Sequence, residues 1–420
     1  MTDVHGAIDA VWRIESARIV AGVARIVRDV GLAEELAGDA LVAALEQWPE
    51  SGVPNNPGAW LMAIAKRRAI DLIRRKETYQ RKLAEMGHEL EIGSNGVEAS
   101  TEIQVEAILE DHIEDDLLRL VFTACHPVLT MDARVTLTLK LLGGLKTDEI
   151  ARAFLAPETT IAQRIVRAKR NLAKAGVEFE VPAGPELLDR LGSVLEVVYL
   201  IYNEGYSATA GDDWMRPALC NEAMRLGRLL VELMPDEPEV LGLLALMELQ
   251  SSRANARVGP DGEPVLLLEQ DRRRWDRLLI NRGLAALDRA WALEKPPGPY
   301  LLQAAIAACH ARALDPDDTD WARIAGLYAV LAQLVPSPVV ELNRAVAISM
   351  AFGPEQGLAA VDTLTDEPSL KDYHLLPSVR GDLLFKLGRL DEARMEFEKA
   401  ANLTRNERER TLLLERAAAC

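Results

Sequence analysis

Residues 147–172 read TDEIARAFLAPETTIAQRIVRAKRNL, and this stretch predicts two helices separated by a tight turn. Thr147 can cap a short first helix, because Asp148 and Glu149 follow it in the first turn. That helix should end near Phe154, since Pro157 disfavours helical geometry at the residue before it. A second helix is expected over 158–174. Its apolar stripe consists of Ile161, Ile165, Ala168 and Leu172.

A short helix, a turn and a longer helix with an exposed basic face form a helix-turn-helix, whose second helix can lie in the major groove of DNA. Arginine pairs bidentately with guanine, and glutamine with adenine. An ordinary helical hairpin with a solvated basic face is the alternative for this stretch alone. The candidates for base or backbone contact are Thr160, Gln163, Arg164, Arg167, Lys169, Arg170 and Lys174.

The charge of the chain is unevenly distributed. Its 420 residues carry a formal net charge of −17. Residues 59–82 nevertheless hold eight basic and two acidic residues, and residues 136–176 hold eight basic and three acidic ones. An acidic protein can bind nucleic acid only through local patches, because its summed field repels phosphate. These two basic segments are therefore the expected contact surfaces.

The remaining composition indicates an all-α protein. Alanine and leucine are abundant, and no alternating apolar and polar run of strand length stands out. We find no apolar run of 18 residues and no basic-then-apolar leader, so we expect no membrane span and a cytoplasmic location. The chain lacks a P-loop, a nucleophile elbow, an HExxH and a GxGxxG motif, so no enzymatic activity is expected.

Two Cys-His pairs are candidate metal ligands. Cys125–His126 and Cys309–His310 together offer four ligands of the kind that zinc prefers. They lie in different predicted domains and at helical positions, so buried packing is favoured. We predict no cofactor and no metal.

The first basic segment follows an acidic helix. Residues 32–48, LAEELAGDALVAALEQW, form an amphipathic helix with exposed acids, and a loop at Pro57 and Gly58 precedes the basic helix. Trp60 is either a base-contacting side chain or a core anchor, and the second interpretation is favoured. The candidate residues of this segment are Asn55, Asn56, Trp60, Lys66, Arg67, Arg68, Arg74 and Arg75.

The order of these motifs resembles the extracytoplasmic-function class of bacterial sigma factors. AEELAGDALVAALEQW resembles the family helix that docks on the β′ clamp helices of RNA polymerase core. AWLMAIAKRRAIDLIRRK resembles the segment for promoter −10 recognition and DNA opening, and TDEIARAFLAPETTIAQRIVRAKRNLAK resembles the −35 helix-turn-helix. The resemblance implies that the first basic segment holds −10 phosphates and a flipped base, and that the second reads the −35 element. It also implies polymerase contacts by Glu34, Glu35, Leu36, Asp39 and Leu41.

The expected domains follow from this resemblance. They are a −10 and core-binding domain over 1–82, an acidic linker over 83–115, a −35 domain over 116–176 and a helical extension over 185–420. The acidic linker is either a solubilising spacer or, as the resemblance implies, a segment that threads toward the active-centre and RNA-exit channels of polymerase.

The extension is expected to be a stack of helices related to tetratricopeptide repeats. In its last unit, small and large residues alternate as in that repeat; they are Gly381, Leu384, Gly388, Ala393, Phe397 and Ala400. Such stacks present a concave surface to a protein or peptide. The expected helices cover 186–202, 216–234, 238–254, 265–294, 299–314, 320–335, 338–351, 355–364 and 373–387.

The stretches YNEGYSA (202–208), PDEPEVLGLLALM (235–247) and QDRRRWDRLLI (270–280) resemble the extension of a sigma-factor group with a large tetratricopeptide-like C-terminal part. This resemblance implies control of sigma activity in cis. A positive role is weakly favoured over an inhibitory one. The alternative function is a one-component DNA-binding regulator, or a repeat scaffold, that does not require polymerase core.

Overall fold

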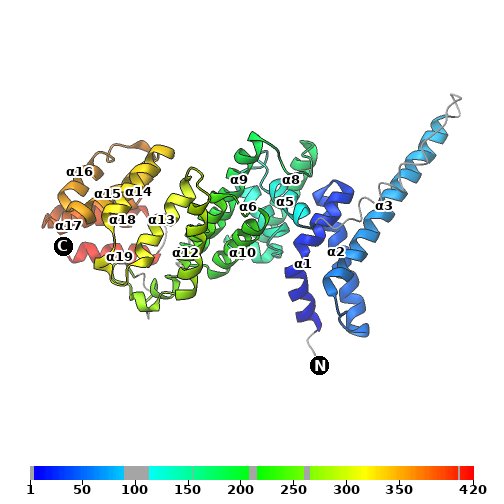
Figure 1. Cartoon of the computed structure of the whole chain (residues 1–420), viewed down its shortest axis with the longest axis horizontal. Coiled ribbons are helices and arrows are strands. Elements are labelled where there is room, and N and C mark those ends of the chain that lie inside the picture. The colour runs from blue at the N-terminus through cyan, green and yellow to red at the C-terminus, as the bar shows by residue number, and fades with distance from the viewer. Residues whose placement is uncertain (1–3, 89–112, 155, 208–214, 260–264, 405–406) are drawn as a thin grey trace. The chain divides into compact units, whose positions relative to one another are not determined.

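The computed structural model describes residues 4–88, 113–154, 156–207, 215–259, 265–404 and 407–420. Within these ranges the regular elements are α-helices and short 3₁₀-helices, so the all-α prediction is confirmed (Figure 1). The chain divides into two compact units, residues 1–197 and 198–420. The division falls within helix α9 (Pro185–Tyr206).

The first unit begins with three helices that pack on one another: α1 (Val4–Val27), α2 (Val30–Ser51) and α3 (Pro57–His88). The Asp29 carboxylate caps α2 by accepting a hydrogen bond from the Leu32 N–H at 2.9 Å. Many of the buried positions are alanines, which let the helix axes approach closely. The core side chains include Ile19, Val23, Ala37, Ala44, Trp48, Leu61, Ala65 and Ala69.

Helix α3 continues to His88, beyond the start of the predicted linker at residue 83. The next described element, α5 (Ile113–Ala124), begins within the last residues of that predicted linker. Residues 89–112 lie outside the described residues, so the linker remains a prediction.

The opening motif folds as a helix-turn-helix. Helices α7 (Thr147–Ala153) and α8 (Glu158–Lys174) follow α6 (Met131–Leu141), and the four apolar residues predicted for the stripe of α8 are buried. The predicted cap at Thr147 is wrong by one residue. Lys146 precedes the helix in an extended conformation, and its backbone N–H donates to the Glu149 carboxylate at 2.8 Å.

The second unit contains α-helices that succeed one another along the chain, each packed on the next (Figure 1). Five of them begin with proline at the first or second helical position, where the missing N–H has no intrahelical partner in any case. The helices that follow α9 in this unit are α10 (Pro217–Leu233), α11 (Pro238–Ser251), α12 (Arg277–Ala292), α13 (Pro299–Arg312), α14 (Trp321–Leu334), α15 (Pro338–Phe352), α16 (Pro354–Asp362), α17 (Leu375–Lys386), α18 (Leu390–Leu403) and α19 (Glu407–Ala418).

One predicted helix of this unit, over 265–294, is too long at its start. Helix α12 begins at Arg277, because the Asp276 carboxylate caps it by accepting from the Leu278 and Leu279 N–H groups. The residue before this cap, Trp275, is extended and buried in the core. The Asp276 cap therefore sets the start of the helix.

The last predicted repeat corresponds to the pair α17 and α18. A Cβ on Gly381 would come within 3.0 Å of the Phe397 ring, so the two helices approach closely at this point. Gly388 between them has φ +73°, a conformation that favours glycine. These are the small and large residues that the sequence pattern singled out.

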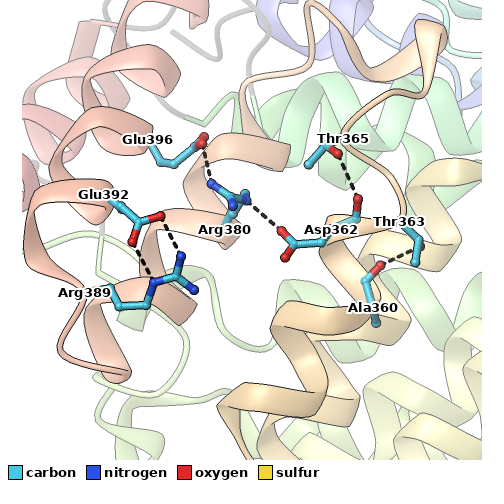
Figure 2. A network of polar contacts seen from close by, with 8 residues as sticks. All are labelled: Ala360, Asp362, Thr363, Thr365, Arg380, Arg389, Glu392 and Glu396. Atoms are coloured by element: carbon cyan, nitrogen blue, oxygen red, sulfur yellow. Dashed lines mark hydrogen bonds and ion pairs between the residues drawn. The ribbon is translucent and has the colours of Figure 1, made fainter.

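A polar network joins three neighbouring helices of this region (Figure 2). Arg380 of α17 pairs with Asp362, the last residue of α16, and with Glu396 of α18, each at 2.8 Å. Arg389 and Glu392 form a second, local pair beside it. Arg380 is thus the common partner of the helices before and after its own.

Candidate nucleic-acid interface

A groove of about 920 Å³ lies beside α3 and is bordered by α1. Its lining includes four of the residues predicted for −10 contact: Asn56, Lys66, Arg67 and Arg74. Helix α1 adds Arg18, which was not predicted from the sequence. The first basic segment therefore presents several cations to one concave surface.

A second hollow of about 510 Å³ follows farther along α3. Arg74 and the predicted Arg75 line it together with Tyr79, whose side chain is 64 % exposed. An exposed aromatic ring beside arginines is suited to stacking on an unpaired base. Tyr79 was not predicted, although its place at the end of the basic segment was a usable signal.

The loop before α3 presents two exposed amides, Asn55 and Asn56. The Asn56 side-chain oxygen accepts from the Ala59 N–H at 3.1 Å and so caps the helix. Trp60 packs edge to face on the buried Trp48, with ring centroids 5.3 Å apart. This contact favours the interpretation of Trp60 as an anchor between α2 and α3.

Arg68 lies apart from the other predicted −10 residues. Its guanidinium pairs with the Asp39 carboxylate of α2 at 3.0 Å, and it is not among the residues that line the groove. Arg68 and Asp39 were predicted to contact different partners, DNA and polymerase. In the structure they contact each other.

Helix α8 exposes most of its predicted contact residues. Two others are engaged within the first unit: Arg164 pairs with Asp132 of α6 at 3.1 Å, and Lys169 pairs with Glu34 of α2. The exposed residues are Thr160, Gln163, Arg167, Arg170 and Lys174. These lie on the face opposite the buried stripe, as a DNA-reading helix requires.

The exposed face of α2 differs from the predicted one. Glu35 and Asp39 are exposed and Leu41 is half-buried, but Leu36 is only 6 % exposed and belongs to the core. Leu36 is therefore unsuited to direct contact with a partner. Val42, which is 51 % exposed, shares the helical spacing of Glu35 and Asp39 and was missed.

Comparisons with known proteins agree with this geometry. The family model for sigma-70 region 2 matches residues 14–78, and the model for sigma-70 region 4 matches residues 119–172. The ECF RNA polymerase sigma factor SigK of Mycobacterium tuberculosis (strain ATCC 25618 / H37Rv) is 28 % identical over 37 % of this chain and 78 % of its own length. SigK of Mycobacterium ulcerans (strain Agy99) is 27 % identical over the same shares.

The chain belongs to the extracytoplasmic-function sigma factors.

A third family model matches the sigma factor beyond regions 2 and 4. Residues 190–291 match a family of unknown function, DUF6596. Uncharacterized protein R00370 of Rhizobium meliloti (strain 1021) is 43 % identical over 97 % of this chain and 94 % of its own length. The similarity to R00370 thus includes the helical extension as well as regions 2 and 4.

Sigma factors bind RNA polymerase core and promoter DNA, and the family is not enzymatic. Among the described helices of this sigma factor, none is both long enough and apolar enough for a transmembrane span.

Regions 2 and 4 of the sigma factor contact each other within the first unit. Glu34 of α2 pairs with Lys140 of α6 at 3.6 Å as well as with Lys169 of α8. Two exposed pairs, Arg13–Glu149 at 2.8 Å and Lys146–Asp9 at 3.2 Å, join α1 to the start of the helix-turn-helix. Glu34, predicted to be exposed, is therefore half-buried at this contact.

A buried ion pair joins α1 to α5 within the same unit. Asp116 of α5 is 2 % exposed and pairs with Arg25 of α1 at 3.1 Å and with Arg119 at 2.7 Å. Burial raises the pKa of the Asp116 carboxyl, and the two arginines oppose that rise. Asp116 is thus a charged contact of the core and was not predicted.

The start of α9 is bonded to region 4. Arg190 donates to the Phe122 carbonyl at 2.9 Å, and Arg134 of α6 donates to the Ser193 hydroxyl at 2.6 Å. The Ser193 hydroxyl donates in turn to the Cys125 carbonyl at 2.7 Å. The helix that begins the extension is therefore part of the fold of region 4.

The cysteines have a packing role where the structure describes them. The Cys125 thiol is buried 3.4 Å from the Thr138 hydroxyl, and burial raises its pKa to about 11. Burial has the opposite effect on a cationic group, and it lowers the pKa of His310 to about 3, with Arg253 and Arg272 lowering it further. No three His, Cys, Asp or Glu side chains among the described residues are arranged to hold a metal ion.

Proposed function

We propose that this sigma factor docks on the β′ clamp helices of RNA polymerase through the exposed face of α2, acting in the cytoplasm. In this proposal the groove beside α3 holds the −10 strand, and the exposed face of α8 reads the −35 element.

The observation that carries the proposal is the groove of region 2. It collects Lys66, Arg67 and Arg74 on one concave surface, with Arg18 and Tyr79 adding a cation and an aromatic ring nearby. Cations hold the phosphates of a single strand, while aromatic rings stack on its bases. A repressor that binds only duplex DNA does not need such a surface.

In vitro transcription with purified core polymerase tests this function. We expect transcripts from a cognate promoter only when the protein is added. Arg67→Ala should lower promoter opening about tenfold, because a phosphate or base contact is lost. Lys76→Ala is the matched control, since Lys76 is an exposed cation of α3 outside both hollows. Operator binding that needs no core, with no transcripts, would favour the one-component regulator instead.

We also propose that the extension controls sigma activity in cis, with a positive role. The support is the first part of α9, which hydrogen bonds to α5 and α6 of region 4 through Arg190 and Ser193. A change in the extension can reach the −35 domain along this helix. A protein or peptide that binds the helical stack of the second unit is part of the same proposal.

A further inference from the structure

The second unit contains a cavity of about 200 Å³ that neither the DNA contacts nor the polymerase contacts use. It is lined by α11, α13, α14 and the segment between α11 and α12. Leu246, Leu249 and Ile306 supply apolar walls. Its polar and aromatic lining consists of Gln250, Arg253, Trp275, Gln303, His310 and Tyr328.

Arg253 brings a positive charge to the cavity. Its guanidinium donates to the Tyr206 hydroxyl and lies 6.0 Å from the centre of the Trp275 ring. Neither partner carries a negative charge. A half-buried cation with a phenol and an indole ring as neighbours favours an anion beside it, because partial burial weakens the screening of charges by water.

Trp275 brings a hydrogen-bond donor. The side chain is 3 % exposed, and its indole Nε1–H has no acceptor among the described residues. Buried donors are nearly always satisfied in folded proteins. An acceptor within the cavity would satisfy this one.

His310 and Arg272 complete the electrostatic environment. Arg272 is committed to structure, because it donates to the His310 and Ala313 carbonyls at 2.8 Å and to the Thr319 hydroxyl at 3.1 Å. It therefore holds the end of α13, on which His310 lies, in place. Burial, with Arg253 and Arg272 beside it, lowers the pKa of His310 to about 3, so its ring is neutral and Arg253 is the charged side chain of the lining.

The size of the cavity limits the ligand. Pockets for drug-sized ligands and cofactors are typically about 300 to 1,000 Å³, so this cavity is too small for a nucleotide or a folded peptide segment. We propose that it binds a small organic acid, with a carboxylate at Arg253 and the Trp275 indole N–H and an apolar or aromatic body against Leu246, Leu249 and Ile306.

The number of uncommitted donors favours a carboxylate over a phosphate. Arg253 and the Trp275 N–H supply one charge and two kinds of donor, which match two carboxylate oxygens. The Gln303 amide is already engaged, since its oxygen accepts from the Tyr199 hydroxyl and its nitrogen donates to the Pro299 carbonyl. A phosphate, with more oxygens and more charge, would leave acceptors unmatched.

Benzoate is a suitable probe, and the indole N–H signals of the full ¹⁵N-labelled chain are a suitable readout. The chain has seven tryptophans, and the signal of Trp275 is the one that disappears in Trp275→Phe. We expect benzoate to move this signal downfield and to saturate with a Kd on the order of 0.1 mM, as its size allows. Benzamide, which has the same shape without the charge, should bind at least about tenfold more weakly.

Variants at two neighbouring arginines complete the test. Arg253→Gln should weaken benzoate binding at least about tenfold, and Arg253→Lys should restore part of it because the charge returns. Arg273→Gln is the matched control, since Arg273 is 90 % exposed and pairs only locally with Asp271. Thermal unfolding without benzoate checks that each variant is folded, and the benzamide comparison needs no variant.

Three results would overturn the proposal. One is the absence of a saturable Trp275 shift up to about 10 mM benzoate, well above the expected Kd. Another is equal binding of benzoate and benzamide, or of benzoate to the folded Arg253→Gln variant. The third is inorganic phosphate moving the Trp275 signal as strongly as benzoate does. All of these measurements are made without polymerase, so they are independent of the proposed sigma activity.

Discussion

Glu34 shows how one side chain can belong to two surfaces. Sequence resemblance assigns it to polymerase contact and Lys169 to DNA contact, yet in the structure their side chains pair. Lys140 approaches the same carboxylate at 3.6 Å. In the proposed DNA complex, the Glu34 carboxylate therefore competes with a promoter phosphate for the Lys169 ammonium group.

Replacing Glu34 by Gln should therefore strengthen binding of the free sigma factor to promoter DNA. We expect a gain of about threefold, the scale of a partly exposed ion pair, because Lys169 is released for phosphate contact. The slope of log K against log salt should steepen by about one unit. Filter binding or fluorescence anisotropy at several salt concentrations measures both.

Glu35→Gln is the control for this effect. Glu35 is exposed on the same helix, and its replacement by Gln removes the same charge. Equal gains in the two variants would mean that general repulsion, and not the pair with Lys169, limits DNA binding.

Trp60 offers a second test at a single residue. If it anchors α3 on Trp48, Trp60→Phe should keep both stability and transcription, since an aromatic edge-to-face contact remains. Trp60→Ala should lower the free energy of unfolding by about 2 kcal/mol. Urea denaturation and in vitro transcription report the two properties separately. A Trp60→Phe protein that is stable but fails to open the promoter would indicate a base-reading role instead.

Helix α8 separates its arginines into two kinds. Arg167 is exposed on the face opposite the core, whereas Arg164 is held by Asp132. We expect Arg167→Ala to lower affinity for −35 DNA about tenfold with little change in thermal stability. Arg164→Ala should also lower the unfolding midpoint, because it leaves Asp132 without this partner. A loss of stability in Arg167→Ala equal to that in Arg164→Ala would contradict this division.

The helices were the most predictable part of the fold. The bounds of α8 follow from Pro157 and an apolar stripe, both of which are local in sequence. Predictions that depended on distant partners were weaker. Leu36 is buried because α2 packs a wider face against the first unit than its apolar spacing predicts. Glu34 is half-buried because Lys169, far along the chain, pairs with it. The cavity at Arg253 was not predictable, since its lining comes from three helices and a loop.

At the scale of the whole molecule, the main question is what the extension contributes. A chain that ends at Val197 keeps the Arg190 and Ser193 contacts with region 4, whereas one that ends at Gly176 loses them. We expect the free energy of unfolding of the −35 domain to be at least about 2 kcal/mol lower in the shorter chain, because several hydrogen bonds are lost.

Transcription by these two chains then tests the sign of the control. With a positive extension, the 1–197 chain should bind core polymerase as the full chain does but yield fewer transcripts from the same promoter. Core binding is measured by co-migration in gel filtration, and transcription by run-off assay. More transcripts from the 1–197 chain than from the full chain would instead identify the extension as an inhibitor.

The buried pair of Arg25 and Asp116 has a consequence for how relatives of this chain diverge. Losing one member of a buried pair strands a charge in the core, which costs far more than replacing both with apolar residues. The two positions should therefore change together during evolution, either remaining oppositely charged or becoming uncharged in concert. Covariation between them across homologous sequences would mark those sigma factors in which α1 and α5 stay in contact.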